Sequence, residues 1–253
     1  MDFGSLTLLA CLSIFVGVLI GGVGIGGILL VPMLTYLLSF DVHVAVAAAM
    51  FSYIFSGVVG TWIYARESSI KWNMVFWLLA SAAPAAFLGA YALSVMPARG
   101  VELLIAALVI FAGINAFRAP RGLKPDNPPL SRTALTGTGI ATGIGSALSG
   151  TGGPLIVVPL LVWLKQPALV AIGLAQVVQV PIAIMATAGN YLYGHVNFQI
   201  GGVIALGLII GVTGGARLAH LASQDVLQRV VAWVLLAVGV FMLTRISLDM
   251  LGA

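Results

Sequence analysis

Residues 21–32 read Gly-Gly-Val-Gly-Ile-Gly-Gly-Ile-Leu-Leu-Val-Pro, and residues 149–159 read Ser-Gly-Thr-Gly-Gly-Pro-Leu-Ile-Val-Val-Pro. Each stretch is a cluster of glycines between two apolar segments that are short for a membrane span, and each ends on a proline. In hydrocarbon, an irregular backbone is tolerated only where protein or a water-filled cavity satisfies its amides. Two such breaks at corresponding places therefore predict broken or re-entrant helices that meet at a binding site in the middle of the membrane.

The composition places the chain in a lipid bilayer. Of 253 residues, 61% are hydrophobic and only 7% are charged, which is too little polar surface for a soluble protein of this size. The apolar runs are continuous, which predicts transmembrane helices and not the alternating strands of a β-barrel. The formal net charge of +4 then indicates which side of the membrane each loop occupies, and it does not indicate binding to nucleic acid.

The apolar segments form two sets of five, which predicts an internal duplication. The first set covers 6–22, 28–40, 44–64, 74–95 and 103–117; the second covers 134–148, 155–164, 168–192, 200–218 and 226–244. We therefore expect an all-α polytopic membrane protein with two homologous repeats, 1–118 and 133–253, each a glycine-rich helix pair followed by three transmembrane helices. Residues 119–132 would be a basic, proline-rich cytoplasmic linker.

The first two segments of each repeat decide the topology. They are 10 to 17 residues long, shorter than the roughly 20 residues that a span requires. If each pair is a re-entrant hairpin or two short spans, the repeats are inverted; if each pair joins into one broken span, they are parallel. With the linker in the cytoplasm, the inverted arrangement places nine of the eleven Lys and Arg residues inside, and the parallel one places seven. We expect the inverted arrangement, with both termini outside.

Helix N-termini at the two breaks would offer unpaired N–H groups and the positive end of the helix dipole to an anion. Pro154 suits the first turn of such a helix because its missing N–H would be unpaired there anyway. The candidate substrate-binding residues are Gly24, Gly26, Gly27, Ser52, Ser149, Thr151, Gly152, Gly153, Gln176 and Gln179. For the two glutamines, hydrogen bonds between helices are an equal alternative. Single glycine motifs usually serve close helix packing, but two matched copies favour a binding site.

The polar residues that are missing also constrain the function. Apart from Glu102, near the start of its segment, no Asp or Glu lies inside an apolar segment, which argues against a cation carrier. No sequence motif for a nucleotide, a metal or another cofactor is present, so we expect no enzyme activity, no cofactor and no metal site. His43, His195 and His220 fall near segment ends, and we interpret them as residues of the membrane interface.

The sequence resembles the TauE/SafE family of sulfite exporters and related anion permeases. The resemblance rests on residues 24–32 and 151–159, and on Gly89 and residues 214–217 in the later segments, and it spans essentially the whole chain. It implies a duplicated helical unit in the bacterial cytoplasmic (inner) membrane. It also implies transport of a sulfur-containing anion such as sulfite or an organosulfonate.

We therefore expect a secondary transporter that binds a small anion, a sulfur oxyanion or a sulfonate, at mid-membrane and moves it by alternating access. Its partners would be this substrate and the lipid bilayer, and it would not bind nucleic acid. A homodimer is compatible with the sequence. Two alternatives stay open. One is a membrane subunit or assembly protein that uses its glycine faces to pack partners, and the other is an anion channel.

Overall fold

The computed structural model describes residues 3–24, 26–67, 69–118, 130–221 and 224–251, and these form an all-helical polytopic membrane protein. The long helices are α1 (Phe3–Val23), α3 (Val42–Arg66), α4 (Trp72–Val95), α5 (Ala98–Arg118), α6 (Arg132–Ser149), α8 (Ala168–Tyr193), α9 (Phe198–Leu221) and α10 (Gln224–Leu251). After α1, a 3-10 turn η1 (Gly26–Leu29), α2 (Leu30–Pro32) and a π-helical turn η2 (Met33–Leu37) make one short helix, which we call the first half-helix. The second half-helix is α7 (Pro154–Trp163).

Every predicted apolar segment coincides with a helix, and six helices are long and apolar enough to span a membrane: α1, α3, α4, α5, α8 and α9. The expectation that the first segment is too short was wrong. Helix α1 has 21 residues because it begins at Phe3, so it is about 31 Å long. The predicted linker lies largely outside the described residues, and α6 already begins at Arg132, behind the N-cap residue Ser131.

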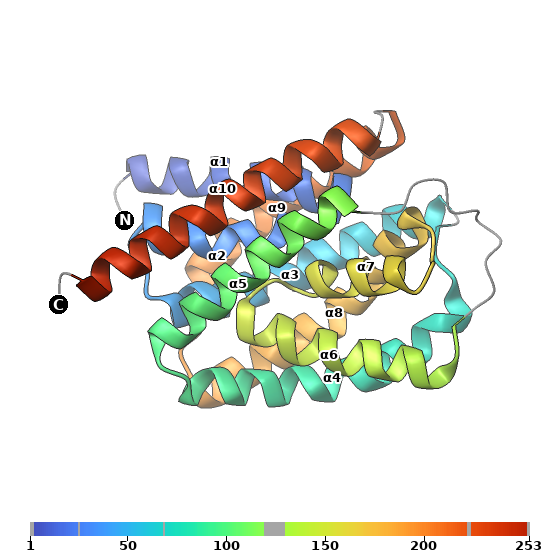
Figure 1. Ribbon diagram of the computed structural model, residues 1–253, viewed down its shortest axis with the longest axis horizontal. Helices are drawn as coiled ribbons and strands as arrows, with labels where there is room; N and C mark the ends of the chain where they lie inside the picture. The colour runs from blue at the N-terminus through green and yellow to red at the C-terminus, as the bar shows by residue number, and fades with distance from the viewer. Residues whose placement is uncertain (1–2, 25, 68, 119–129, 222–223, 252–253) are drawn as a thin grey trace.

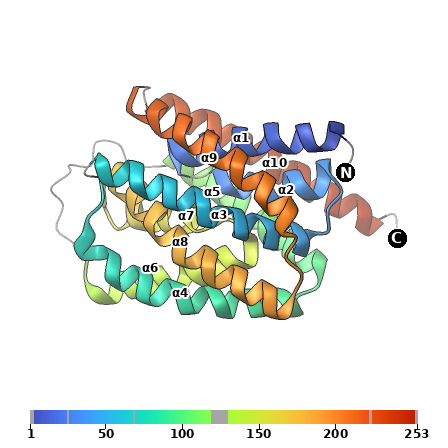
Figure 2. The same cartoon turned by 180° about the vertical axis from the view of Figure 1, so that it is seen from behind.

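The chain reverses direction at each break, so each first helix and its half-helix form a hairpin (Figures 1 and 2). The start of α1 and the end of α10 lie at one end of the molecule, whereas α5 ends and α6 begins toward the opposite end (Figure 1). Helix α6 runs in the opposite direction to α1, its counterpart by position in the sequence (Figure 1). These directions agree with the hairpin alternative and with the inverted arrangement. The homology of the two halves itself stays a prediction.

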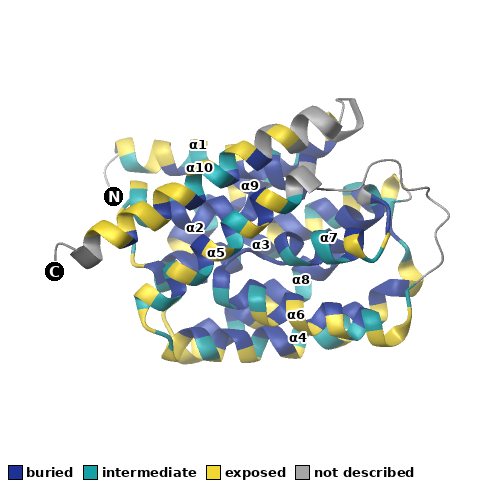
Figure 3. Cartoon of the chain, viewed as in Figure 1, coloured by how far each residue is buried: buried dark blue, intermediate teal, exposed yellow. Residues whose placement is uncertain are grey.

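Helices α3 and α8 form the centre of the bundle. In their apolar spans, 61% and 72% of the residues are buried, compared with 33–44% in the other four candidate spans. Exposed residues lie mainly on the outward faces of the surrounding helices (Figure 3). The two most buried candidate spans are therefore the helices that directly follow the two half-helices in the chain.

The helices of the two halves pack against each other in an exchanged pattern. Helix α1 packs on α9, and α6 packs on α4; likewise α3 packs on α9, and α8 packs on α4. The remaining large interfaces join counterparts, α3 with α8 and α5 with α10. A two-fold relation between the halves would produce this exchange.

Glycines make the two exchanged interfaces α1–α9 and α4–α6 unusually close, because a Cβ at these positions would collide with a backbone oxygen of the facing helix. The contacts recur at an offset of 126 residues: Gly17 on the Leu208 oxygen and Gly143 on the Ala82 oxygen, and Gly89 on the Ile144 oxygen and Gly215 on the Val18 oxygen. Small residues allow such close approach in membranes, where dispersion contacts drive association. These glycines thus pack helices of the same chain against each other.

The N-terminus of α3 is capped by Asp41, whose Oδ1 accepts hydrogen bonds from the His43 N–H at 2.8 Å and the Val44 N–H at 3.4 Å. We expect Asp41→Ala to lower the free energy of unfolding by about 1 kcal/mol, whereas Asp41→Asn, which keeps a capping oxygen, should lower it by less than half as much. Thermal unfolding of the two purified variants in detergent measures this. Equal losses would mean that the charge of Asp41, and not its cap, stabilises α3.

Candidate functional site

Both breaks contain glycines whose backbone other residues rarely adopt. Gly24 has φ 77° and Gly150 has φ 67°, and each ends the helix before it. Gly152 and Gly153 follow with φ 75° and 119°, and Gly153 is the N-cap of α7, directly before Pro154. Only glycine, which has no Cβ, adopts a positive φ without a steric penalty. These glycines therefore allow the chain to turn back within the membrane.

The two breaks touch each other next to Tyr53 of α3. A Cβ at Gly27 would lie 2.8 Å from the Thr151 carbonyl oxygen, and a Cβ at Gly152 would lie 2.7 Å from Cδ2 of the Tyr53 ring. The Tyr53 hydroxyl donates a hydrogen bond of 2.7 Å to the Gly27 carbonyl oxygen. We call this contact of Gly27, Tyr53, Thr151 and Gly152 the crossing. It leaves no space for even one methyl group between the two backbones.

Side chains from α3 and α8 cap the end of α1 at the first break. The last carbonyls of a helix lack a partner within the helix. Gln176 Nε2 donates to the Ile20 carbonyl oxygen at 3.3 Å, and the Tyr64 hydroxyl donates to the Gly21 carbonyl oxygen at 2.8 Å. The first break is therefore fastened to the centre of the bundle.

The second break is capped by its own hydroxyl groups. Ser149 Oγ donates to the Gly145 carbonyl oxygen at 2.6 Å and lies 3.1 Å from Thr151 Oγ1. The Thr151 N–H bonds back to the Ser146 carbonyl oxygen at 3.3 Å. The two breaks are thus stabilised by different groups: side chains of α3 and α8 at the first break, and hydroxyl groups of the break itself at the second.

Backbone donors remain at the start of α7. Its first N–H groups have no partner inside the helix, and within the described ranges the N–H groups of Gly152 and Gly153 donate no hydrogen bond to the protein. The Gly153 carbonyl already accepts from Ile156 and Val157, each at 3.1 Å. The free amides of Gly152 and Gly153 could bind an oxyanion.

Gln176 and Gln179 both make hydrogen bonds between helices. Gln179 Nε2 donates to Ser56 Oγ at 2.9 Å and to the Tyr53 carbonyl oxygen at 3.2 Å. Gln176 Oε1 is buried without a hydrogen-bond partner in the described structure, and it lies directly against Gly60, where a Cβ would collide with it. This arrangement is the packing alternative that the sequence left open for these residues, and it does not test a substrate role.

All ten predicted site residues are buried, but the structure brings only some of them together. Gly27, Thr151 and Gly152 meet at the crossing, and Gly153 lies beside Gln179, whose Cα is 3.7 Å from the position of a Cβ on Gly153. Ser149 lies beside Thr151, and Gln176 reaches the end of α1. The remaining three positions lie apart: Gly24 faces Ile172 and Val158, Gly26 packs on Val16, Leu19 and Ile20 of α1, and Ser52 donates to the Ala49 oxygen of its own helix.

Tyr53 was missed by sequence reasoning because a tyrosine in an apolar segment resembles an ordinary core residue. A signal was present. Small and hydroxyl-bearing residues follow one another along one face of α3 at helical spacing: Tyr53, Ser56, Gly57, Gly60 and Tyr64. This stripe faces the glutamines of α8, because Gly57 lies against Gln179 and Gly60 against Gln176.

Cationic side chains gather at one end of the bundle. At the end where α3 stops and α6 starts, Arg66 stacks on Trp62 at 3.8 Å from the ring centre, Arg132 stacks on Trp77 at 5.2 Å, and Lys71 Nζ donates to Gln166 Oε1 at 3.4 Å. Cationic and aromatic residues of this kind mark a membrane–water interface. We call the end where α3 stops and α6 starts the basic end.

A groove of about 810 Å³ between α3, α4 and α8 opens beside Trp62 and has almost entirely apolar walls.

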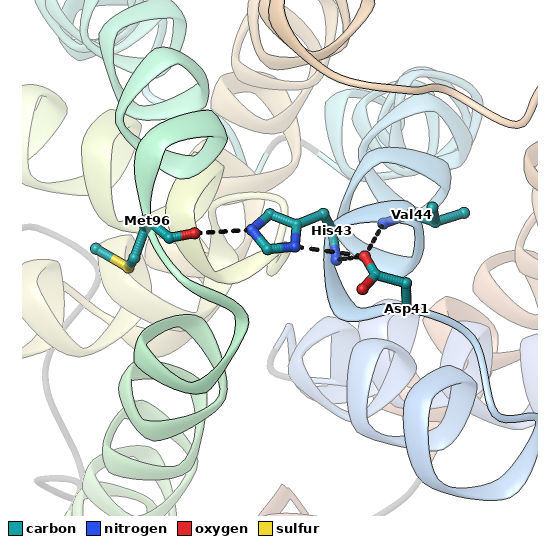
Figure 4. Close-up of polar contacts among 4 residues, drawn as sticks. All are labelled: Asp41, His43, Val44 and Met96. Atoms are coloured by element: carbon teal, nitrogen blue, oxygen red, sulfur yellow. Dashed lines mark hydrogen bonds and ion pairs between the residues drawn. The ribbon is translucent and has the colours of Figure 1, made fainter.

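His43 lies at the opposite end of the molecule. Its Nε2 is 3.0 Å from the Met96 carbonyl oxygen and its Nδ1 is 3.3 Å from Asp41 Oδ1, so the ring bridges the start of α3 and the connection between α4 and α5 (Figure 4). His195 is exposed in the loop between α8 and α9. His43 and His195 thus lie near helix ends, as predicted; the side chain of His220, the third predicted interface histidine, lies outside the described residues. Among the described residues, no cluster of three His, Cys, Asp or Glu side chains could hold a metal ion.

Comparison with known proteins identifies the family. The family model "Sulfite exporter TauE/SafE" matches residues 9–242. The chain belongs to the TauE/SafE family. Among curated relatives, the probable membrane transporter protein YdhB of Bacillus subtilis is 25% identical over 87% of this chain and 93% of its own length.

Two further relatives are similar over nearly their whole length. A probable membrane transporter protein of Methanocaldococcus jannaschii is 23% identical over 96% of this chain and 98% of its own length. A probable membrane transporter protein of Xylella fastidiosa is 24% identical over 91% of this chain and 92% of its own length. No solved structure matches the chain. The protein is thus a multi-pass membrane transporter of the TauE/SafE family, as the resemblance at the glycine breaks implied.

Proposed function

We propose that this TauE/SafE protein is a secondary transporter of a small anion, sulfite or an organosulfonate, which binds at mid-membrane where the two breaks meet. The observation that carries the proposal is the crossing itself. Two glycine breaks from opposite halves of the chain lie in backbone contact, the amides of Gly152 and Gly153 are free, and Gly153 lies beside Gln179.

The depth of the crossing supports this proposal. The second half-helix, α7, has 10 residues and is therefore about 15 Å long. It leads from the crossing to the basic end, where Gln166 contacts Lys71. The first half-helix leads from the crossing to the opposite end, where α3 begins beside Met96. An anion between the breaks would be about halfway through a hydrocarbon core of roughly 30 Å.

The chemistry around the crossing favours an anion over a cation. The donors there are backbone N–H groups, hydroxyl groups and a carboxamide: the amides of Gly152 and Gly153, the hydroxyls of Ser149 and Thr151, and the side chain of Gln179. Helix N-termini add positive partial charge. Glu102 lies near the start of α5 and accepts a hydrogen bond from Tyr36 at 3.3 Å, so it is placed at a helix end and not at the crossing. A carboxylate that would attract a cation or relay protons is not part of the proposed site.

Alternating access would follow from the exchanged packing of the two halves. All ten predicted site residues are buried, so the structure has the two breaks closed on each other. The breaks must part toward one side and then the other for an anion to enter and leave. Transport would be uniport or would be coupled through protonation of the substrate or through sodium. An anion channel would share the fold, and saturable counter-transport would distinguish the transporter from it.

The packing-subunit alternative loses its main support. The glycines that could have packed a partner protein contact facing helices of the same chain, as in the interfaces α1–α9 and α4–α6. We further propose that the protein resides in a bacterial cytoplasmic membrane with the basic end in the cytoplasm, because Arg66, Lys71, Arg132 and Lys165 all lie at that end. The proposed activity requires no catalytic residue and no cofactor.

Thermal unfolding in the presence of different anions tests the proposal. The purified protein in detergent is heated with sulfite, sulfate, thiosulfate, taurine, sulfoacetate, lactate or chloride. A ligand that binds only the folded protein stabilises it by about 2.7 kcal/mol at one hundred times its Kd. We expect one sulfur oxyanion or sulfonate to raise the melting temperature in a concentration-dependent way, while chloride at equal ionic strength does not. Equal effects of all seven at millimolar concentrations would contradict the proposal.

A further inference from the structure

Tyr53 contacts both breaks at once. Its hydroxyl donates to the Gly27 carbonyl oxygen at 2.7 Å, and its ring lies so close to Gly152 that a Cβ there would be 2.7 Å from Cδ2. The side chain is 1% exposed. Gly27 and Gly152 belong to different halves of the chain, so Tyr53 of α3 is the side chain that ties the first half-helix to the turn before the second.

This double contact has a geometric consequence for transport. An anion that reaches the amides of Gly152 and Gly153 from between the breaks needs the backbones of Gly27 and Thr151 to separate, because they are in van der Waals contact. Tyr53 cannot follow both breaks as they move apart. Either its hydrogen bond to Gly27 or its packing on Gly152 must be lost in every opening.

We propose that Tyr53 is the positioning residue that holds the two breaks closed, and that its hydrogen bond to Gly27 is the contact that is broken when they part. The inference rests on the proposed function, because it takes the crossing as the place where the substrate passes. Gly27 lies on the first half-helix and the ring of Tyr53 on the central helix α3, and both are buried.

The chain supplies a matched control in Tyr64. It lies on the same face of α3, its side chain is 0% exposed, and its hydroxyl donates to the Gly21 carbonyl oxygen at 2.8 Å. Tyr64→Phe and Tyr53→Phe remove the same chemical group, and each leaves a backbone carbonyl oxygen with one hydrogen-bond donor fewer. A purely structural role predicts similar losses of stability in both variants, and a role at the crossing predicts an additional effect of Tyr53→Phe alone.

The experiment measures how often the crossing opens, without any substrate. Ser149→Cys, at a buried position next to Thr151, is placed in a Cys11→Ser background, because Cys11 is exposed. The rate of its modification by N-ethylmaleimide is followed by mass spectrometry. We expect Tyr53→Phe to raise the rate about fivefold, the factor that one neutral hydrogen bond contributes, and Tyr64→Phe to leave it within twofold. A reference cysteine, Ser13→Cys, is buried on α1 against Gly207 of α9 and should stay equally slow in both variants.

Two results would overturn the inference: equal rates for Ser149→Cys in the Tyr53→Phe and Tyr64→Phe variants, or a rise at Ser13→Cys as large as at Ser149→Cys. The first would mean that the hydrogen bond does not hold the breaks, and the second that the variant loosens the whole bundle. Neither readout needs an anion. A failure to bind any anion in thermal unfolding would therefore refute the proposed function and would be distinguishable from a failure of the role of Tyr53.

Discussion

Gly215→Ala is expected to lower the free energy of unfolding by about 3 kcal/mol. A Cβ at this position would collide with the Val18 carbonyl oxygen of α1, and backbone atoms cannot rotate away as a side chain can. The helices α1 and α9 would have to separate along their whole interface, and overpacking of this kind costs about 1–3 kcal/mol or more. Thermal unfolding of the detergent-purified variant, followed by circular dichroism, measures the loss.

The neighbouring residue provides the control. A Cβ at Gly214 would meet no atom within 4 Å, and alanine is the better helix former by about 1 kcal/mol. Gly214→Ala should therefore leave the melting temperature unchanged or raise it. Similar losses in the two variants would show that the α1–α9 interface is looser than the structure has it. A Gly215→Ala protein as stable as the parent would contradict the packing described for both exchanged interfaces.

Gly153→Val is expected to weaken anion binding at least tenfold, or about 1.4 kcal/mol. The reason is the backbone and not a lack of space, since a Cβ at Gly153 would have its nearest neighbour, Ile182 Cδ1, at 3.5 Å. A β-branched residue does not adopt φ 119° without strain of about 1–3 kcal/mol. The turn would relax, and the amides of Gly152 and Gly153 would point elsewhere. The readout is the anion-dependent rise in melting temperature.

Gly137→Val is the matched control for this prediction. Gly137 is an exposed glycine of α6 with open space around it, so valine there changes only the outer surface of the helix. The anion-dependent rise should be the same as in the parent protein. If Gly153→Val retained the full response to the anion, the proposed site would be wrong even if transport itself were demonstrated.

Most of the fold could be predicted from the sequence, because in a membrane the apolar segments themselves define the helices. The segment 74–95 became α4 (Trp72–Val95), and 168–192 became α8 (Ala168–Tyr193). The glycine breaks also lay where the sequence placed them. The length of α1 was underestimated because Phe3, Gly4 and Ser5 extend the helix beyond its apolar core.

The candidate site was harder to predict because it depends on how the half-helices fold back. Gly26 and Gly27 are adjacent and chemically identical, yet Gly26 packs on α1 while Gly27 touches the Thr151 carbonyl oxygen of the other break. No sequence spacing distinguishes them. The partner of Gly27, the Tyr53 hydroxyl, comes from a residue 26 positions away, and only the packing of α3 beside the two breaks brings it there.

The exchanged packing also constrains how the protein is made. Helix α1 inserts first, but the face formed by Gly17 and Gly21 has its partner in α9, close to the other end of the chain. At the usual speed of synthesis, on the order of ten seconds pass before α9 emerges from the ribosome. During that time the glycine face of α1 has only lipid, or an insertion chaperone, to cover it. Neither half can complete its own interfaces, so residues 1–118 translated alone should remain unassembled in the membrane and be recovered by co-expression with the other half.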